Sequence, residues 1–89
     1  MRAVITVVGK DAVGILAKVS GCCSDHHINV IEVTQSILQE MFAMIMMVDI
    51  ANSDIPFTRL VDEMTELGKQ NHLVIHCMHE EIFSAMHTI

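Results

Sequence analysis

Aromatic and basic residues are scarce in this sequence of 89 residues. It contains no tryptophan or tyrosine, only three phenylalanines, and five Lys and Arg against eleven Asp and Glu, which gives a formal net charge of −6. Phosphate binding requires clustered cations, and binding of single-stranded nucleic acid requires aromatic platforms. We therefore expect no nucleic-acid partner.

Long apolar runs and a cysteine framework are also missing. No uninterrupted apolar segment approaches the roughly 18 to 20 residues that cross a bilayer, and Arg2 leads directly into a strand-like segment rather than a secretion signal. The three cysteines, Cys22, Cys23 and Cys77, are odd in number and two are adjacent, which makes a poor disulfide framework. We therefore expect a soluble, cytoplasmic protein without a membrane partner.

The length allows one domain, and the hydrophobic fraction of 52% excludes a disordered tail. A domain of this size buries only about 60 to 65% of its unfolded surface, so it often gains stability from a partner subunit. The apolar side chains of the tail (Ile82, Phe83, Met86 and Ile89) add surface for such a contact, and the first three can lie on one side of a short helix. We expect a homodimer.

Four segments have the composition of strands, and they cover about residues 2–8, 29–38, 41–50 and 73–78. The first and last alternate, the second is rich in β-branched residues, and the third is an apolar stretch of strand length. The dipeptide Gln39-Glu40 separates the second segment from the third and can make a tight turn. These two segments are therefore expected to form a hairpin.

Two other segments repeat apolar residues at helical spacing. The first is expected to begin at Asp11, a good N-cap residue, and to run to about Asp25. The second follows Pro56, which suits a first helical turn, and is expected to end at Gly68, a residue type common just beyond a helix.

The resulting order is βαββαβ, the ferredoxin-like α+β unit, in which two helices cover one face of a four-stranded antiparallel sheet. Right-handed crossovers favour the spatial order 4-1-3-2. The second strand then lies at an edge, where a long apolar strand invites pairing.

The loop after the first strand is the candidate binding site. If Asp11 caps the helix, the amides of its first turn are mostly free, and Gly14 has no side chain to block a carboxylate from reaching them. These amides belong to Ala12, Val13, Gly14 and Ile15. The alternative is that Gly14 only permits close packing of the helix on a strand.

The run Gly9-Lys10-Asp11-Ala12-Val13-Gly14-Ile15-Leu16-Ala17-Lys18-Val19, with Ile28-Asn29-Val30 at the next strand, resembles the ACT domain, a small regulatory module that binds amino acids. The resemblance covers about residues 4 to 78, as a single domain with a tail over 79–89. That tail resembles the small stand-alone ACT proteins of bacteria and archaea. The family often has Pro or a small residue where this chain has Val13, so rigidity of the loop is less assured.

The resemblance implies that a ligand contacts the amides from Asp11 to Ile15 and the side chain of Asn29, frequently at a subunit interface. The alternative for Asn29 is a turn former before the strand.

Six histidines and three cysteines raise the question of a metal site. Cys22 and Cys23 are consecutive on a helix, so they point about 100° apart and cannot easily share an ion. His26 and His27 end the first helix, where a cation suits the negative end of the helix dipole. We expect no metal site and no cofactor.

Met41, Met44 and Met47 do not share one face of a strand, so they are expected to fill the core or an interface. No nucleophile with a neighbouring base is recognisable, and we expect no enzymatic activity.

The sequence and its resemblance to the ACT domain thus predict a homodimeric regulatory module. We expect it to sense a small molecule, namely an amino acid, and to have no catalytic role. The alternative is a protein–protein interaction or structural module that uses its open sheet or edge strand and binds no ligand.

Overall fold

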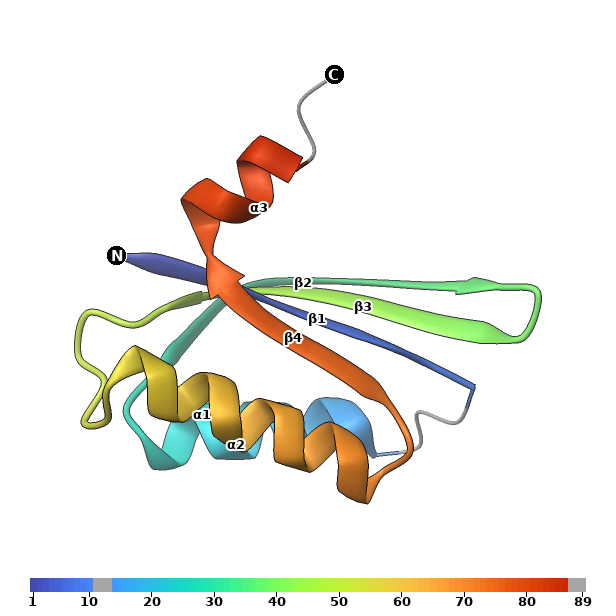
Figure 1. The fold of residues 1–89 in the computed structure, drawn as a ribbon, viewed down its shortest axis with the longest axis horizontal. Helices are drawn as coiled ribbons and strands as arrows, with labels where there is room; N and C mark the ends of the chain where they lie inside the picture. Colours follow the sequence, from blue (N-terminus) through green and yellow to red (C-terminus); the bar gives the residue numbers. More distant parts are fainter. Residues whose placement is uncertain (11–13, 87–89) are drawn as a thin grey trace.

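The computed structural model describes residues 1–10 and 14–86. Its elements are β1 (Arg2–Gly9), α1 (Ile15–Asp25), β2 (Asn29–Leu38), β3 (Met41–Asp49), α2 (Phe57–Gln70), β4 (Val74–His79) and α3 (Glu80–Met86), as Figure 1 shows. The predicted βαββαβ order is confirmed, and the tail forms a third helix. Among the described residues, no helix combines the length and the apolar character that a membrane span requires.

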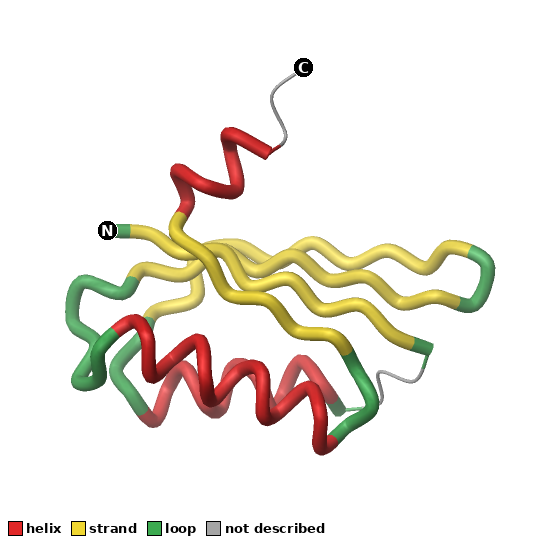
Figure 2. Tube along the Cα trace, viewed as in Figure 1, coloured by secondary structure: helices red, strands yellow, loops and turns green. Residues whose placement is uncertain are grey.

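The four strands form one antiparallel sheet in the order β2-β3-β1-β4. This is the predicted order, and it leaves β2 at an edge. Helices α1 and α2 cover one face of the sheet, whereas α3 stands on the opposite face (Figures 1 and 2). The β2–β3 hairpin turns at Gln39 and Glu40, both with positive φ (48° and 73°), as a two-residue hairpin turn requires.

The core lies between the sheet and the two helices. Alternate residues of β1 point into it, since Ala3, Ile5 and Val7 belong to the core cluster with residues of α1 and α2, whereas Val4 is fully buried but lies outside that cluster. Met44 of β3 is 1% exposed, whereas Met41 is 37% exposed on the other face, which confirms that these methionines do not form one stripe.

Gly68 is needed for close packing rather than for ending a helix. The prediction that the second helix ends there is wrong, because α2 continues to Gln70 and has Asn71 at its C-cap. A Cβ atom at Gly68 would lie 2.7 Å from the carbonyl oxygen of Leu73. Leu73 also donates its N–H to the carbonyl oxygen of Gly68 at 2.8 Å, so the chain folds back tightly over this glycine.

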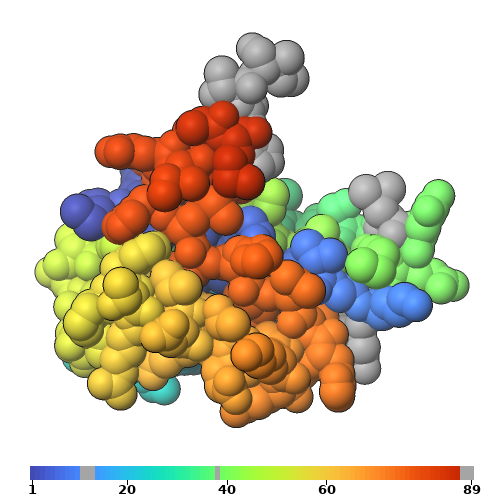
Figure 3. All heavy atoms as spheres, viewed as in Figure 1, coloured from blue at the N-terminus to red at the C-terminus, as the bar shows by residue number. Residues whose placement is uncertain are grey.

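The tail helix is tied to the start of the sheet. Glu80 lies 3.5 Å from the guanidinium of Arg2, and α3 contacts both β1 and β4. In the space-filling view α3 stands over the part of the sheet near the N-terminus, away from the tip of the β2–β3 hairpin (Figure 3). Phe83 is half-buried, but Ile82 and Met86 remain 53% and 67% exposed in a single copy of the chain.

Candidate functional site

The N-terminus of α1 begins later than predicted. The helix starts at Ile15, and Gly14 occupies the N-cap position with φ 73° and ψ 2°, without a side-chain cap. Lys18 donates its N–H to the carbonyl oxygen of Gly14 at 3.1 Å. The prediction of a helix beginning at Asp11 is therefore wrong, and the first-turn amides without an intrahelical partner belong to Ile15, Leu16 and Ala17.

Three predicted site residues, Asp11, Ala12 and Val13, lie outside the described residues. Gly14 is described, and the idea that it allows close helix-on-strand packing is wrong. It is exposed, and a Cβ atom built on it would meet nothing within 4 Å. Its left-handed backbone, with φ 73°, is what favours glycine.

Asn29, the other predicted contact, is the first residue of β2 and pairs with Asp49 of β3. Its side chain is exposed and makes no hydrogen bond within the part of the chain that the structure describes. The turn before it is made by His27, which has a positive φ of 60°. Asn29 lines a shallow pocket of about 620 Å³ between the end of α1 and β2. The other residues of this pocket are Ser20, Ser24, His27, Ile28, Val30 and Asn52.

The two halves of the predicted site lie at opposite ends of α1. This helix has 11 residues, so it separates Gly14 from the turn before Asn29 by about 16 Å at the usual rise per residue. The strand pairing shows the same separation. Asn29 and Arg2 both pair with Asp49 at one end of the sheet, whereas Gly9, at the other end of β1, pairs with Phe42. One copy of the chain does not bring the two halves together.

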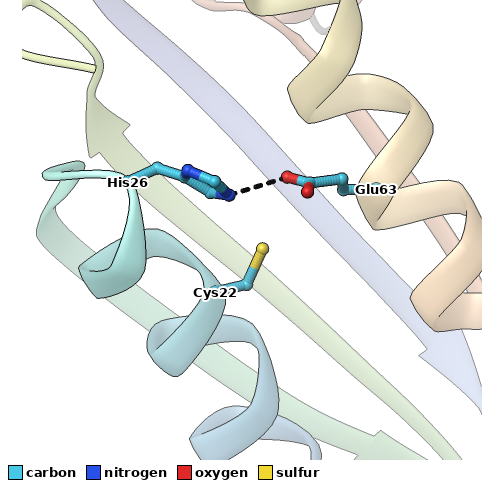
Figure 4. A group of neighbouring side chains, drawn as sticks. All are labelled: Cys22, His26 and Glu63. Carbon is cyan, nitrogen blue, oxygen red and sulfur yellow. Dashed lines mark ion pairs between the residues drawn. The ribbon is translucent and has the colours of Figure 1, made fainter. Parts of the chain in front are cut away.

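A second group of functional side chains joins the end of α1 to α2. Cys22 and His26 lie one turn apart, and Glu63 of α2 points toward both of them (Figure 4). Nε2 of His26 lies 2.9 Å from Oε2 of Glu63, and Nδ1 on the other side of the ring lies 2.9 Å from Oδ1 of Asp54. The three side chains in Figure 4 offer a sulfur, a nitrogen and an oxygen atom within 4.8 Å of one another. They are therefore the described residues best placed to hold a metal ion.

All three thiols are poor nucleophiles. Burial raises the pKa of Cys22, with the charges of Glu63 and Asp25 adding to the effect. Burial likewise raises the pKa of Cys23 to about 11 and that of Cys77 to about 12. The thiol forms therefore dominate at neutral pH, and these residues lack the low pKa that marks a reactive cysteine.

The group formed by Cys22, His26 and Glu63 is not among the sites expected from the sequence. The adjacent pair Cys22-Cys23 argues against a shared ion, and the position of His26 at the helix end indicates only an interaction with the helix dipole. The spacing of Cys22 and His26 by four residues places both on one helix face, and this signal was available in the sequence. Glu63 was not, because its position depends on how α1 and α2 pack.

Known proteins resemble this chain over nearly its whole length. A family model described as the ACT domain matches residues 2–78. A UPF0237 protein of Bifidobacterium longum is 44% identical over 88 residues, which cover 99% of this chain and 98% of that protein. A UPF0237 protein of Clostridium perfringens is 44% identical over 89 residues, with full coverage of both chains.

A solved structure gives the same result. The ACT domain protein from Streptococcus pneumoniae superposes with a TM-score of 0.81 at 36% identity, over 93% of each chain. The match of family model, length and fold extends over nearly the whole molecule. The chain therefore belongs to the ACT domain family, whose members are generally regulatory ligand-binding modules.

Proposed function

We propose that the protein is a regulatory module that binds an amino acid between two copies of the chain. The first turn of α1 in one copy holds the ligand carboxylate, and Asn29 of the other copy binds its amino or carboxyl group. The observation that carries the proposal is the start of α1, where Gly14 is exposed and a Cβ atom built on it would meet no atom of the described residues within 4 Å. The amides of a first helical turn, at the positive end of the helix dipole, suit a carboxylate.

The edge strand supports a site made by two copies. Helix α1 contacts β2, and it begins on the side of the molecule toward which β2 runs, although the β2–β3 hairpin extends beyond that start (Figure 1). If two β2 edges pair in antiparallel fashion, Asn29 of one copy approaches the far end of β2 in the other. That end lies on the same side of the molecule as the start of the other copy's α1, so the pairing would bring Asn29 toward the helix start that it cannot reach in its own chain.

The exposed apolar residues of β2 support the same pairing. Ile31 is 42% exposed and Ile37 is 76% exposed, and β2 has no lysine or proline to discourage a partner strand. A dimer would bury these side chains and form two equivalent sites.

No catalytic step is part of this proposal, and the raised pKa values of the described thiols argue against a thiolate nucleophile. The free state of Cys22, Cys23 and Cys77 is compatible with the reducing cytoplasm, which we propose as the location.

A thermal-shift screen of the twenty amino acids tests this function, together with light scattering for the molecular mass. A ligand at 100 times its Kd should stabilise the folded protein by about 2.7 kcal/mol, which raises Tm by roughly 10 °C or more. We expect one chemical group of amino acids to do this, and a mass of twice the 9.9 kDa chain. A monomer with no response to any amino acid would contradict the proposal.

A second candidate is an interaction module that needs no ligand. The face of the sheet opposite α1 and α2 carries exposed apolar side chains, with Val8 at 41%, Ile45 at 39% and Val74 at 56% exposure. A protein partner could cover this patch. The same screen distinguishes the two functions, because the ligand-free module would form its assembly without responding to any amino acid.

A further inference from the structure

We propose that Cys22, His26 and Glu63 bind one divalent cation of the zinc class per chain, between the end of α1 and α2 (Figure 4). The three ligand atoms lie within 4.8 Å of one another. Around Zn²⁺, with bonds of about 2.0 to 2.3 Å, tetrahedral ligand atoms lie roughly 3.3 to 3.7 Å apart. Small side-chain shifts therefore suffice for all three to share one ion. This site is independent of the proposed amino-acid site.

The orientation of the imidazole ring is the first support for this site. The carboxylate of Asp54 can only accept a hydrogen bond, so Nδ1 of His26, 2.9 Å away, carries a proton and donates it. In the neutral ring the lone pair then lies on Nε2, which faces Glu63. Histidine ligands of metals are commonly held in this way by a carboxylate on the other ring nitrogen.

A buried oxygen atom is the second support. Oε2 of Glu63 is buried and has no hydrogen-bond partner among the residues that the structure describes. Nε2 of His26 lies 2.9 Å from it, within ion-pair distance. A cation bonded to both atoms would satisfy this oxygen.

Local charge is the third support. Asp25 and Glu63 lie close enough to Cys22 to oppose its thiolate, and Asp54 adds a carboxylate on the far side of His26. A divalent cation would offset the repulsion between these negative groups, because it stabilises the thiolate and the carboxylates together. On binding, the S–H bond of Cys22 breaks, its proton goes to water, and the sulfur bonds to the metal.

The donor set indicates the kind of metal. One thiolate, one imidazole and one carboxylate suit Zn²⁺ or its spectroscopic substitute Co²⁺ rather than Mg²⁺ or Ca²⁺, which prefer oxygen atoms alone. Three protein ligands leave the fourth tetrahedral position for water or another small ligand.

The competing account is an ion-pair bridge, in which protonated His26 joins Asp54 to Glu63 and no metal binds. Titrating the reduced, chelator-treated full chain with Co²⁺ separates the two accounts. We expect one equivalent per chain, with thiolate-to-cobalt charge-transfer absorption and the visible bands of a tetrahedral site. Zn²⁺ should then displace the cobalt. Absence of the charge-transfer band in the unmodified protein would overturn the proposal without any variant.

Variants assign the ligands. Cys22→Ser should abolish the charge-transfer band, and His26→Gln and Glu63→Gln should each weaken Zn²⁺ binding at least tenfold in competition with a chromophoric chelator. Asp54→Asn should keep the band and weaken binding by about 10- to 100-fold, the usual effect of removing a carboxylate behind a histidine ligand. Circular dichroism of each metal-free variant checks its folding.

Two variants serve as matched controls. Cys77→Ser removes another half-buried thiol, and His76→Gln removes an exposed imidazole on β4. Both should bind Zn²⁺ like the unmodified protein. Equal losses in the controls, or unchanged affinity in His26→Gln and Glu63→Gln, would place the metal elsewhere and overturn the assignment.

Discussion

Asp54 contacts His26 through both its backbone and its side chain. Its N–H donates to the carbonyl oxygen of His26 at 3.2 Å, and its Oδ1 lies 2.9 Å from Nδ1 of the ring. The hydrogen bond to Asp54, with the charges of Glu63 and Asp54, raises the pKa of His26 above its ordinary 6.5 against an opposing effect of desolvation. The folded protein therefore binds this proton more tightly than the unfolded chain does.

This difference predicts a pH-dependent stability for the metal-free protein. The contribution of a raised histidine pKa is fully present below pH 6.5 and is lost as the pH rises through the value in the folded state. We expect Tm of the chelator-treated protein to fall from pH 6.5 upward. Asp54→Asn keeps the backbone hydrogen bond but loses the carboxylate, so its fall should be smaller. Thermal melts at several pH values measure the change of Tm with pH in the unmodified protein and in Asp54→Asn. An equal change in the two proteins would contradict the role assigned to Asp54.

Replacing Gly14 or Gly21 by alanine should change the free energy of unfolding in opposite directions. A Cβ atom at Gly14 or at Gly21 would meet no atom of the described residues within 4 Å, but of these two glycines only Gly14 has a positive φ, of 73°. Gly14→Ala should lower the free energy of unfolding by about 1 kcal/mol or more, because alanine is strained in that conformation. Gly21→Ala should raise it by about 0.5 to 1 kcal/mol, because alanine is the better helix former. Urea denaturation of the two variants measures the difference, and two effects of the same sign would disprove this interpretation.

Asn29 provides the sharpest test of the amino-acid site. Its side chain makes no hydrogen bond among the described residues, so Asn29→Ala should leave Tm without ligand nearly unchanged. Binding of the amino acid found in the screen should weaken by roughly 1 to 3 kcal/mol, or about 5- to 150-fold in Kd. Isothermal titration calorimetry gives the affinity. If binding survives while the ligand-free variant melts early, Asn29 has a structural role.

The edge strand should carry the dimer contact. Ile37 of β2 is 76% exposed, and Val74 of β4, at the opposite edge, is 56% exposed. Ile37→Lys places a charge on the proposed contact and should shift the mass from a dimer toward the 9.9 kDa chain. Val74→Lys adds the same charge at the other edge and should keep the dimer. Light scattering at equal concentrations gives the molecular mass of the two variants. Dissociation of the Val74→Lys variant alone would show that the interface lies at β4 instead.

Most of the fold could be predicted because its signals are local. Alternation predicted the first and fourth strands, and β-branched or apolar segments of strand length predicted the second and third. The turn expected at Gln39-Glu40 gave the correct bounds of β2. The errors at the helix ends have a shared cause. A glycine signals either a special backbone conformation or a close approach of another chain segment, and only the folded chain distinguishes Gly14, which has the first property, from Gly68, which has the second.

The sites were harder to predict because their parts come from distant segments. Gly14 and Asn29 are close in sequence, yet α1 carries them to opposite ends of the sheet. Glu63 follows Cys22 by 41 positions and reaches it only through the packing of α1 and α2. Residues on one helix face can be paired from sequence, whereas contacts between helices require the three-dimensional arrangement.

The unprotected edge of β2 also affects how the protein must be handled during refolding. Its only charged side chain is Glu32, and its exposed backbone groups can accept any extended segment, including one from a partly folded chain. The proposed edge pairing and aggregation would therefore compete for the same surface. Raising the chain concentration accelerates both processes, so the yield of recovered native protein should pass through a maximum at intermediate concentration rather than rise steadily.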